Sequence, residues 1–265
     1  MPIRLIAIDM DGTLLTDDLQ IPSSAKAAIA AARARGVRVV PATGRMFVSA
    51  LPYARQIGAE GPIIAYNGAK VVDLDGRVRK HHPVPPEEAL ALVDLAEKHD
   101  LCLHLYFEDQ TYVRRFDEGA QYYASLAGVE PVVMPDLRPV ARRGTTKALI
   151  VDDPAAVERW CGELSRRFAG RLLVTRSLPR FVEFMAAGVC KGVALAELAA
   201  ELGLAPEEVM AIGDSYNDID MLTYAGVGVA LGNAQPAVKE MADWVSSANT
   251  DHGVARAIEK FVLAS

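Results

Sequence analysis

The sequence predicts an α/β fold with a doubly wound, Rossmann-like core of parallel strands and an inserted α+β domain. Short apolar runs alternate with helix-like segments over the first 81 residues and again from residue 191, which is typical of parallel sheets wound with helices. Between these stretches, alternating apolar and polar residues indicate antiparallel strands instead. Carboxylates directly follow two of the apolar runs, at the strand ends where open α/β sheets place their ligand sites.

The first stretch begins the doubly wound pattern. Ser23 or Ser24 is expected to cap the first helix, and Gly36 suits the turn that ends it. A second helix is expected to kink at Pro52, and Asp75-Gly76 predicts a hairpin turn. The expected strands are the apolar runs at 3–8, 37–40 (closing at Thr43) and 62–66, with hairpin strands at 70–74 and 78–81.

Pro83, Pro85 and Pro86 mark a break, after which the pattern changes. Residues 101–107 alternate apolar and polar side chains, as in a half-exposed antiparallel strand, so we expect a sheet with one helical face. This domain is predicted to cover residues 84–186, between core segments 1–83 and 187–265. Its other strands are expected at 111–115, 146–151, 171–175 and 180–185, with helices near 87–99, 118–126 and 154–168.

From Lys191 the doubly wound pattern returns. Strands are expected at 209–213 and 227–231, and helices at 191–203, 217–224 and 252–263. Hinges between the two domains are expected near residues 82–86 and 186–190.

The composition excludes several classes of function. The 265 residues include 51% hydrophobic residues and only 6% aromatics, which suits parallel strands covered by Ala-rich helices. The net charge of −6 argues against a nucleic-acid surface. Three cysteines without metal-type spacing suit reduced thiols, and Asp9 and Asp11 interrupt the one candidate signal segment, so a cytoplasmic enzyme with no membrane partner is expected.

Two aspartate clusters carry the chemistry. Asp9 and Asp11 follow the first strand, and Asp214 and Asp218 follow the strand at 209–213. A buried carboxylate is costly unless a metal or a partner satisfies it. Because the carboxyl ends of parallel strands share one edge, the clusters are expected to converge there as a Mg²⁺ site.

Four motifs in order carry a resemblance to a known family. They are Asp9-Met10-Asp11-Gly12-Thr13, Ala42-Thr43-Gly44-Arg45, Lys191 within Gly188–Gly192, and Gly213-Asp214-Ser215-Tyr216-Asn217-Asp218. The chain resembles the haloacid dehalogenase-like hydrolases, and more narrowly the Cof-type phosphatases, whose large cap is inserted between the second and third motifs. The resemblance runs nearly end to end and includes Asn67-Gly68-Ala69, Gly232-Asn233-Ala234 and Asn249-x-Asp251-His252-Gly253-Val254.

The first motif supplies the reacting groups. An aspartate can attack phosphorus and form an aspartyl-phosphate, the role that Asp9 is expected to take. Asp11 would protonate the leaving oxygen and then activate water. The resemblance implies that the backbone carbonyl of Asp11 also binds the metal, and the presence of a second Asp favours phosphoryl chemistry.

The remaining motifs surround the phosphoryl group. Thr43 and Gly44 suit a phosphate oxygen at a strand-to-helix junction, and Lys191 would neutralise phosphoryl oxygens. Asp214 is expected as the main metal ligand of its cluster, and Asn217 as a hydrogen-bond donor to phosphate. Asp218 would bind the metal directly or through water, or orient Lys191. Arg45 would touch substrate or brace its loop, and Asn67 would form a tight turn or contact substrate.

These residues predict a Mg²⁺-dependent phosphatase of small phosphorylated metabolites such as sugar phosphates. A phosphomutase or phosphotransferase and a catalytically silent phosphometabolite-binding protein are the alternatives. The expected partner is a small phosphorylated metabolite, and the chain is expected to be a monomer or a weak homo-oligomer. The sequence does not identify the substrate.

Overall fold

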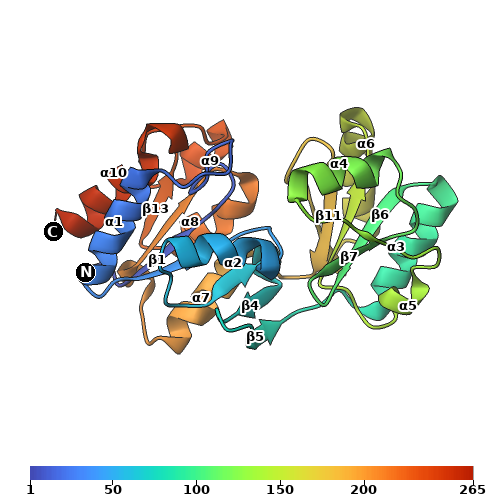
Figure 1. Cartoon of the computed structure of the whole chain (residues 1–265), viewed down its shortest axis with the longest axis horizontal. Coiled ribbons are helices and arrows are strands. Elements are labelled where there is room, and N and C mark those ends of the chain that lie inside the picture. Colours follow the sequence, from blue (N-terminus) through green and yellow to red (C-terminus); the bar gives the residue numbers. More distant parts are fainter. Residues whose placement is uncertain (265) are drawn as a thin grey trace. The chain divides into compact units, whose positions relative to one another are not determined.

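The computed structural model describes residues 1–264 and divides into two compact units (Figure 1). The core unit combines residues 1–80 with the chain from residue 190 onward, and the cap unit is His81–Val189. The chain therefore leaves the core unit once and returns to it once. Within the described residues, no helix is both long enough and apolar enough for a membrane span.

The core unit is built on a five-stranded parallel sheet of order β14-β13-β12-β1-β2. Its strands are β1 (Leu5–Ile8), β2 (Arg38–Pro41), β12 (Val209–Gly213), β13 (Val227–Ala230) and β14 (Trp244–Val245). Strand β1 lies at the junction of the two core segments, because Ile8 pairs with Pro41 on one side and with Ile212 on the other. The carboxyl ends of β1, β2 and β12 therefore share one edge of the sheet.

Helices cover both faces of this sheet. Leu5 and Ala7 of β1 pack in one apolar cluster with α7 and α8. Successive side chains of a strand point to opposite faces, so the fully buried Ile6 and Ile8 face the other side, where α1 packs against α10. The core helices are α1 (Ser23–Ala34), α2 (Phe47–Gln56), α7 (Lys191–Glu201), α8 (Ile219–Tyr224), α9 (Pro236–Met241) and α10 (Gly253–Ile258), which continues as a π-helical turn over Glu259–Leu263. The predicted doubly wound fold class is confirmed.

A small three-stranded sheet follows β2 in the chain. It has the order β3-β4-β5, with β3 (Ile63–Ala65), β4 (Lys70–Val72) and β5 (Val78–His81). Strand β3 extends the parallel arrangement through a single bridge between Ala42 and Ile64. The hairpin turn predicted at Asp75-Gly76 is confirmed, and Gly76 has a φ of 91°, which glycine adopts without a steric penalty.

The cap unit is an α+β structure on a six-stranded sheet of order β10-β11-β9-β6-β7-β8. Its strands are antiparallel except for the pair β7 and β8. They are β6 (Cys102–Phe107), β7 (Gln110–Val113), β8 (Val132–Val133), β9 (Lys147–Val151), β10 (Leu172–Thr175) and β11 (Phe181–Ala186). The helices are α3 (Pro86–His99), α4 (Glu118–Ala127), α5 (Arg138–Ala141) and α6 (Pro154–Arg167).

The prediction of a half-exposed strand at 101–107 and of one helical face is wrong. Helices α3, α5 and α6 pack in the cluster that holds Leu103 and Leu105. His104 and Tyr106 point to the opposite face, yet they are 0% and 2% exposed. Helix α4 contacts β6 and β9 there, and the Tyr123 ring lies 4.5 Å from that of His104. Aromatic packing therefore buries side chains whose polarity predicted exposure.

The predicted serine cap of the first helix is also wrong. Helix α1 begins at Ser23, and the preceding position is Pro22, which provides no side-chain cap. The Ser24 hydroxyl instead makes a hydrogen bond of 2.8 Å with Nδ1 of His252. Sequence periodicity also missed β8, α5, α9 and β14, because elements of two to six residues are too short to show a period.

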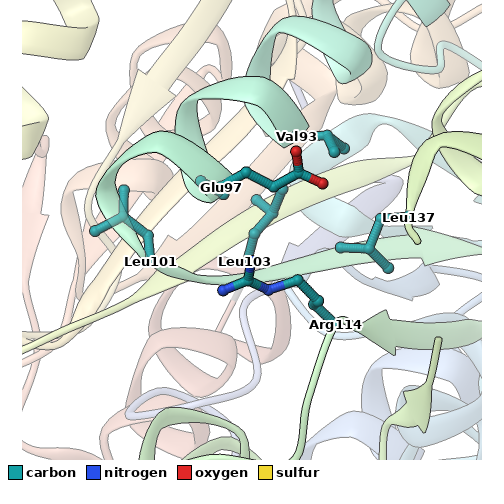
Figure 2. A pocket seen from close by; sticks show the side chains of 7 residues that line it. Val93, Glu97, Leu101, Leu103, Arg114 and Leu137 are labelled. Carbon is teal, nitrogen blue, oxygen red and sulfur yellow. The ribbon is translucent and has the colours of Figure 1, made fainter. Parts of the chain in front are cut away.

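A small pocket lies in the cap unit, between α3 and the strands beneath it (Figure 2). Apolar side chains line most of it, and Glu97, which also lines it, is paired with Arg138 at 2.7 Å. The lining consists of Val93, Ala96, Glu97, Leu101, Leu103, Arg114 and Leu137. None of the residues predicted to carry chemistry belongs to it.

Candidate active site

Three of the four aspartates predicted to converge come together at the carboxyl edge of the core sheet, whereas the carboxylate of Asp11 lies outside their group. Asp9 directly follows β1, and its backbone N–H donates to the carbonyl of Ile212 at 2.9 Å. Asp214 directly follows the neighbouring strand β12, and Asp218 lies one turn further, at the end of a 3₁₀ turn over Tyr216–Asp218. Residues about 200 positions apart in sequence are neighbours here because β1 and β12 pair in register.

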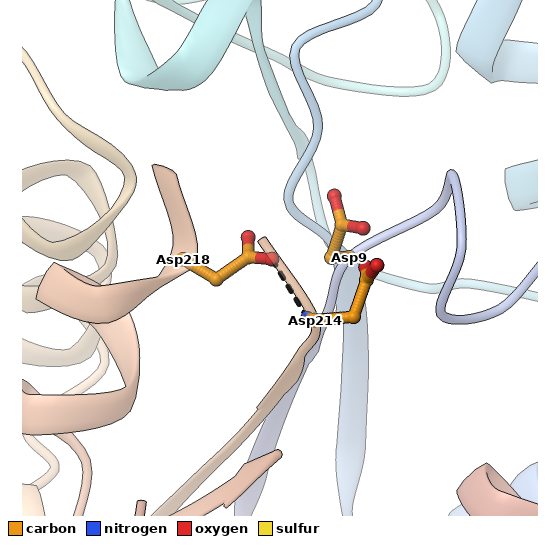
Figure 3. Close-up of side chains that lie close together, drawn as sticks. All are labelled: Asp9, Asp214 and Asp218. Carbon is orange, nitrogen blue, oxygen red and sulfur yellow. Dashed lines mark hydrogen bonds between the residues drawn. The ribbon is translucent and has the colours of Figure 1, made fainter. Parts of the chain in front are cut away.

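Three carboxylates form a compact acidic group (Figure 3). One oxygen each of Asp9, Asp214 and Asp218 lies within 4.8 Å of the others. Burial, reinforced by the charge of Asp218, raises the pKa of Asp9 well above its usual range. Burial and Asp218 likewise raise the pKa of Asp214 to about 6. The site therefore holds negative charge at a cost in free energy, which a cation would offset.

Lys191 provides one positive charge inside this group. It is the first residue of α7 and is 0% exposed. Its Nζ lies 2.5 Å from Oδ1 of Asp9 and 2.7 Å from Oδ1 of Asp218. Burial alone lowers the pKa of Lys191, but the carboxylates of Asp218 and Asp9 outweigh burial and raise it. Lys191 is therefore a buried ammonium that bridges the first and last motifs.

Both oxygens of Asp218 are held by protein donors. Oδ1 accepts from Lys191, and Oδ2 accepts from the backbone N–H groups of Asp214 and Ser215 at 3.0 and 2.9 Å. Gly213 makes this approach possible, because a Cβ there would lie 2.5 Å from Cβ of Asp218. Of the roles left open for Asp218, these contacts favour orienting Lys191 and the loop that carries Asp214.

Asp214 is fixed by neighbours from two other loops. The Thr13 hydroxyl donates to its Oδ1 at 2.8 Å. The Asn233 amide donates to the carbonyl of Gly12 at 2.8 Å and approaches Oδ2 of Asp214 at 3.5 Å. Sequence reasoning gave Asn233 no role, although it stands in the Gly232-Asn233-Ala234 stretch that resembles the family. The structure thus adds Asn233 to the residues around Asp214.

Apart from Lys191 on α7, the predicted phosphate-binding residues lie on the Thr43–Arg45 loop, on the loop of Asn217, and on the turn over Tyr66–Gly68, whose Asn67 contacts both loops. Thr43 is 0% exposed, and its hydroxyl accepts the backbone N–H of Arg45 at 3.1 Å. The amide of Asn217 donates to Oδ1 of Asn67 at 2.9 Å. A Cβ on Gly44 would lie 3.0 Å from the same Asn67 oxygen, so the loop and the turn pack closely.

The carboxylate of Asp11, which was expected among the converging aspartates, pairs with Arg45 instead. The guanidinium donates to both carboxylate oxygens, with 2.8 Å between Nε and Oδ2. The Asp11 side chain is 52% exposed, whereas that of Arg45 is 16% exposed. Burial alone lowers the pKa of Arg45, but the hydrogen bonds and charge of Asp11 outweigh burial and raise it. Sequence reasoning did not anticipate this pair.

The donor set fits a hard divalent cation. Three carboxylates face one ammonium, so the group is left with excess negative charge in a buried position. Carboxylate oxygens are the ligands that Mg²⁺ prefers, usually one or two of them with water and phosphate oxygens. Asp9 and Asp214 are the best candidates, because Asp218 already accepts three hydrogen bonds, one from the Lys191 ammonium and two from backbone N–H groups.

Comparisons with known proteins find relatives over nearly the whole chain. A family model described as haloacid dehalogenase-like hydrolase matches residues 6–258. The 5-amino-6-(5-phospho-D-ribitylamino)uracil phosphatase YcsE of Bacillus subtilis is 33% identical over 261 residues, covering 98% of this chain and 96% of that protein. The pyridoxal phosphate phosphatase YbhA of Escherichia coli is 30% identical over 277 residues, covering 99% of this chain and 100% of that protein.

A solved structure resembles the whole chain as well. The crystal structure of a haloacid dehalogenase-like hydrolase from Bacteroides thetaiotaomicron superposes with a TM-score of 0.88 at 32% identity. The match covers 97% of this chain and 99% of that one. Fold and sequence similarity therefore extend over both units.

Proposed function

The chain belongs to the haloacid dehalogenase-like hydrolases and is a phosphatase of that family, and we propose that it hydrolyses small phosphorylated metabolites with Mg²⁺ through an aspartyl-phosphate on Asp9. The observation that carries this proposal is the buried contact of Lys191 with Asp9 beside Asp214. An ammonium and a metal-binding carboxylate next to a nucleophile suit the transfer of a charged phosphoryl group.

In the first step Asp9 attacks phosphorus. Lys191 engages Oδ1 of Asp9, which leaves Oδ2 to form the new bond while the ester P–O bond breaks. The leaving oxygen takes a proton from Asp11. Thr43, Gly44, Arg45, Lys191 and Asn217 would hold the phosphoryl oxygens. When bound by Asp9, Asp214 and the Asp11 carbonyl, Mg²⁺ would supply positive charge that stabilises the transferring group.

In the second step Asp11 takes a proton from water, which attacks phosphorus and releases phosphate and the Asp9 carboxylate. Both oxygens of Asp11 now accept hydrogen bonds from Arg45, so the guanidinium competes with the leaving oxygen and with water for this carboxyl group. Approach of the phosphate group, which also attracts the guanidinium, is a reason for Arg45 to move. Substrate binding would thus prepare Asp11 for its role.

The relatives and the division of the chain support the proposed substrate class. The two relatives named above act on a phosphorylated ribitylaminouracil and on pyridoxal phosphate, both small phosphorylated compounds. All residues proposed for phosphoryl transfer lie in the core unit. We infer that the cap unit provides substrate selection, which would let one chemical site serve different leaving groups.

Phosphate release from a panel of phosphorylated metabolites tests the function. Sugar phosphates and related monoesters, each with Mg²⁺ and with a chelator, are the compounds to include. Turnover of at least one monoester that stops with the chelator is expected. If no compound released phosphate, not even a generic aryl phosphate, the proposal would be wrong and a binding role would remain for the same site.

Replacing Asp11 by Asn should lower the turnover of alkyl phosphates more than that of aryl phosphates. The amide keeps the shape of the side chain but can neither donate the proton nor act as a base. Alkyl phosphates should lose about 10²–10⁴-fold in kcat, the usual contribution of general acid–base catalysis, whereas aryl phosphates need little protonation and should lose less. Steady-state rates on matched alkyl and aryl substrates measure this. Equal losses on both would indicate that Asp11 is structural.

The metal site should respond to Asp214→Ala and to Ca²⁺. The alanine variant should lose Mg²⁺ affinity with the fold intact, which calorimetry and circular dichroism would show. Ca²⁺ accepts about 6–8 oxygens and tolerates bidentate carboxylates, so it should bind, compete with Mg²⁺ and block the attacking oxygen of Asp9. Unchanged Mg²⁺ affinity in the variant, or robust turnover with Ca²⁺ alone, would contradict this assignment.

A further inference from the structure

The turn over Tyr66–Gly68 has an unusual backbone. Tyr66, Asn67 and Gly68 all have positive φ, at 52°, 54° and 96°. Asparagine and glycine tolerate this region, but a tyrosine there is a strained residue. Such strain persists only where the surroundings impose it, and it clusters at functional sites. Tyr66 and Asn67 are 1% and 2% exposed, so the turn is enclosed in the core unit.

The turn contacts three catalytic segments at once. The N–H of Tyr66 donates to the carbonyl of Arg45 at 3.0 Å, and the N–H of Asn67 donates to that of Thr43 at 2.9 Å. On the other side, a Cβ on Gly68 would lie 2.3 Å from the carbonyl oxygen of Cys190, the residue before Lys191. The backbone of the turn therefore fits between the Thr43–Arg45 loop and the start of α7.

The Asn67 side chain adds the third contact. Its Oδ1 accepts the amide N–H of Asn217 at 2.9 Å and so links the turn to the loop that carries Asp214 and Asp218. An amide nitrogen carries two hydrogens, so Asn217 keeps a second donor for a phosphate oxygen. The hydrogen bond to Asn67 fixes the orientation of the Asn217 amide and therefore also the direction of its second N–H.

We propose that Asn67 is a positioning residue that aligns the Asn217 amide with the Thr43–Arg45 loop as one preformed phosphate-binding frame, and does not itself read the substrate. This rests on the proposed function. It predicts that loss of the Asn67 amide weakens phosphate binding by the same factor whatever the leaving group. A residue that contacted the leaving group would change the preference among substrates instead.

The variants separate the effect of the Asn67 side chain from that of its left-handed backbone conformation. Asn67→Gly keeps the left-handed backbone and removes the amide, whereas Asn67→Ala removes the amide and adds strain. Asn217→Ala removes the donor, and Asn67→Gly with Asn217→Ala completes a double-mutant cycle. Leu19→Gly is the matched control, because Leu19 also has a positive φ of 58° and is 40% exposed, outside the site.

Three measurements follow on Mg²⁺-loaded protein: kcat and KM on an aryl phosphate and on a sugar phosphate, the binding of inorganic phosphate by calorimetry, and thermal unfolding. Asn67→Gly should lose about 10–100-fold in kcat/KM on both substrates, as expected for misplacement of a positioned group. Phosphate binding should weaken in parallel, and the melting temperature should stay near that of Leu19→Gly. The double variant should be no more than about threefold worse than Asn217→Ala, since the two amides act as one unit.

The proposal would be overturned if the losses of the two single variants multiplied in the double variant. It would also be overturned by a loss confined to one substrate, or by wild-type phosphate binding in Asn67→Gly. A melting temperature as low in Asn67→Gly as in Asn67→Ala would do so too, because the amide would then serve the fold. The calorimetry keeps this test separate from the proposed function. If the wild-type protein released no phosphate from any monoester, the binding of inorganic phosphate would still show whether Asn67 positions Asn217.

Discussion

Asp9→Asn should reduce phosphate release by several orders of magnitude. The amide is a poor nucleophile and a poorer metal ligand, so both proposed roles of Asp9 are lost together. The effect should be equally large on alkyl and aryl phosphates, because no substrate can bypass the attack. Steady-state turnover with saturating Mg²⁺ measures the loss, and mass spectrometry should find no phosphorylated intermediate in the variant.

The fold should survive this substitution. Burial raises the pKa of Asp9, so its ionised form is costly in the metal-free protein, and a neutral amide removes that cost. Lys191 keeps Asp218 as a partner at 2.7 Å. The metal-free variant is therefore expected to unfold at the same temperature as the wild-type protein or above it. A well-folded Asp9→Asn preparation with wild-type turnover would end the aspartyl-phosphate mechanism.

The sequence predicted which strand ends carry the aspartates of the site, because the end of a strand is marked by a local pattern. An apolar run followed by Asp9 or Asp214 marks the end of a parallel strand, and parallel strands share their carboxyl edge. The convergence of the two clusters needed only that rule. The bond from Lys191 to Asp9 similarly follows once α7 begins at Lys191 beside the same edge.

What the sequence left open depends on partners that no local pattern records. The pairing of Arg45 with Asp11, and the approach of Asn233 to Asp214, join loops from different strands. The pattern of alternating polarity predicted an exposed face for His104, whereas a helix placed later in the chain covers it. Burial of a polar side chain is decided by tertiary packing, which periodicity in one segment cannot express.

Lys191→Met should cost both activity and stability. Removing one partner of a buried ion pair leaves an uncompensated charge, at about 3–5 kcal/mol. Here two carboxylates, Asp9 and Asp218, would lose the same ammonium while Asp214 remains close. Chemical denaturation of the metal-free protein should show that loss in the free energy of unfolding. Turnover should fall by several orders of magnitude, because nothing replaces the charge beside the phosphoryl oxygens.

A second substitution separates the two effects. Lys191→Met combined with Asp218→Asn removes one of the orphaned charges, and the amide can still accept the backbone N–H groups of Asp214 and Ser215. Part of the stability should therefore return, whereas turnover should not. Mg²⁺ should also stabilise the single variant more than the wild-type protein, because it would then supply the only cation beside Asp9 and Asp214. If the single variant were as stable as the wild type without metal, the buried Lys191 would not be the counter-charge of these carboxylates. Recovery of turnover in the double variant would mean that Lys191 serves the fold and takes no part in the chemistry.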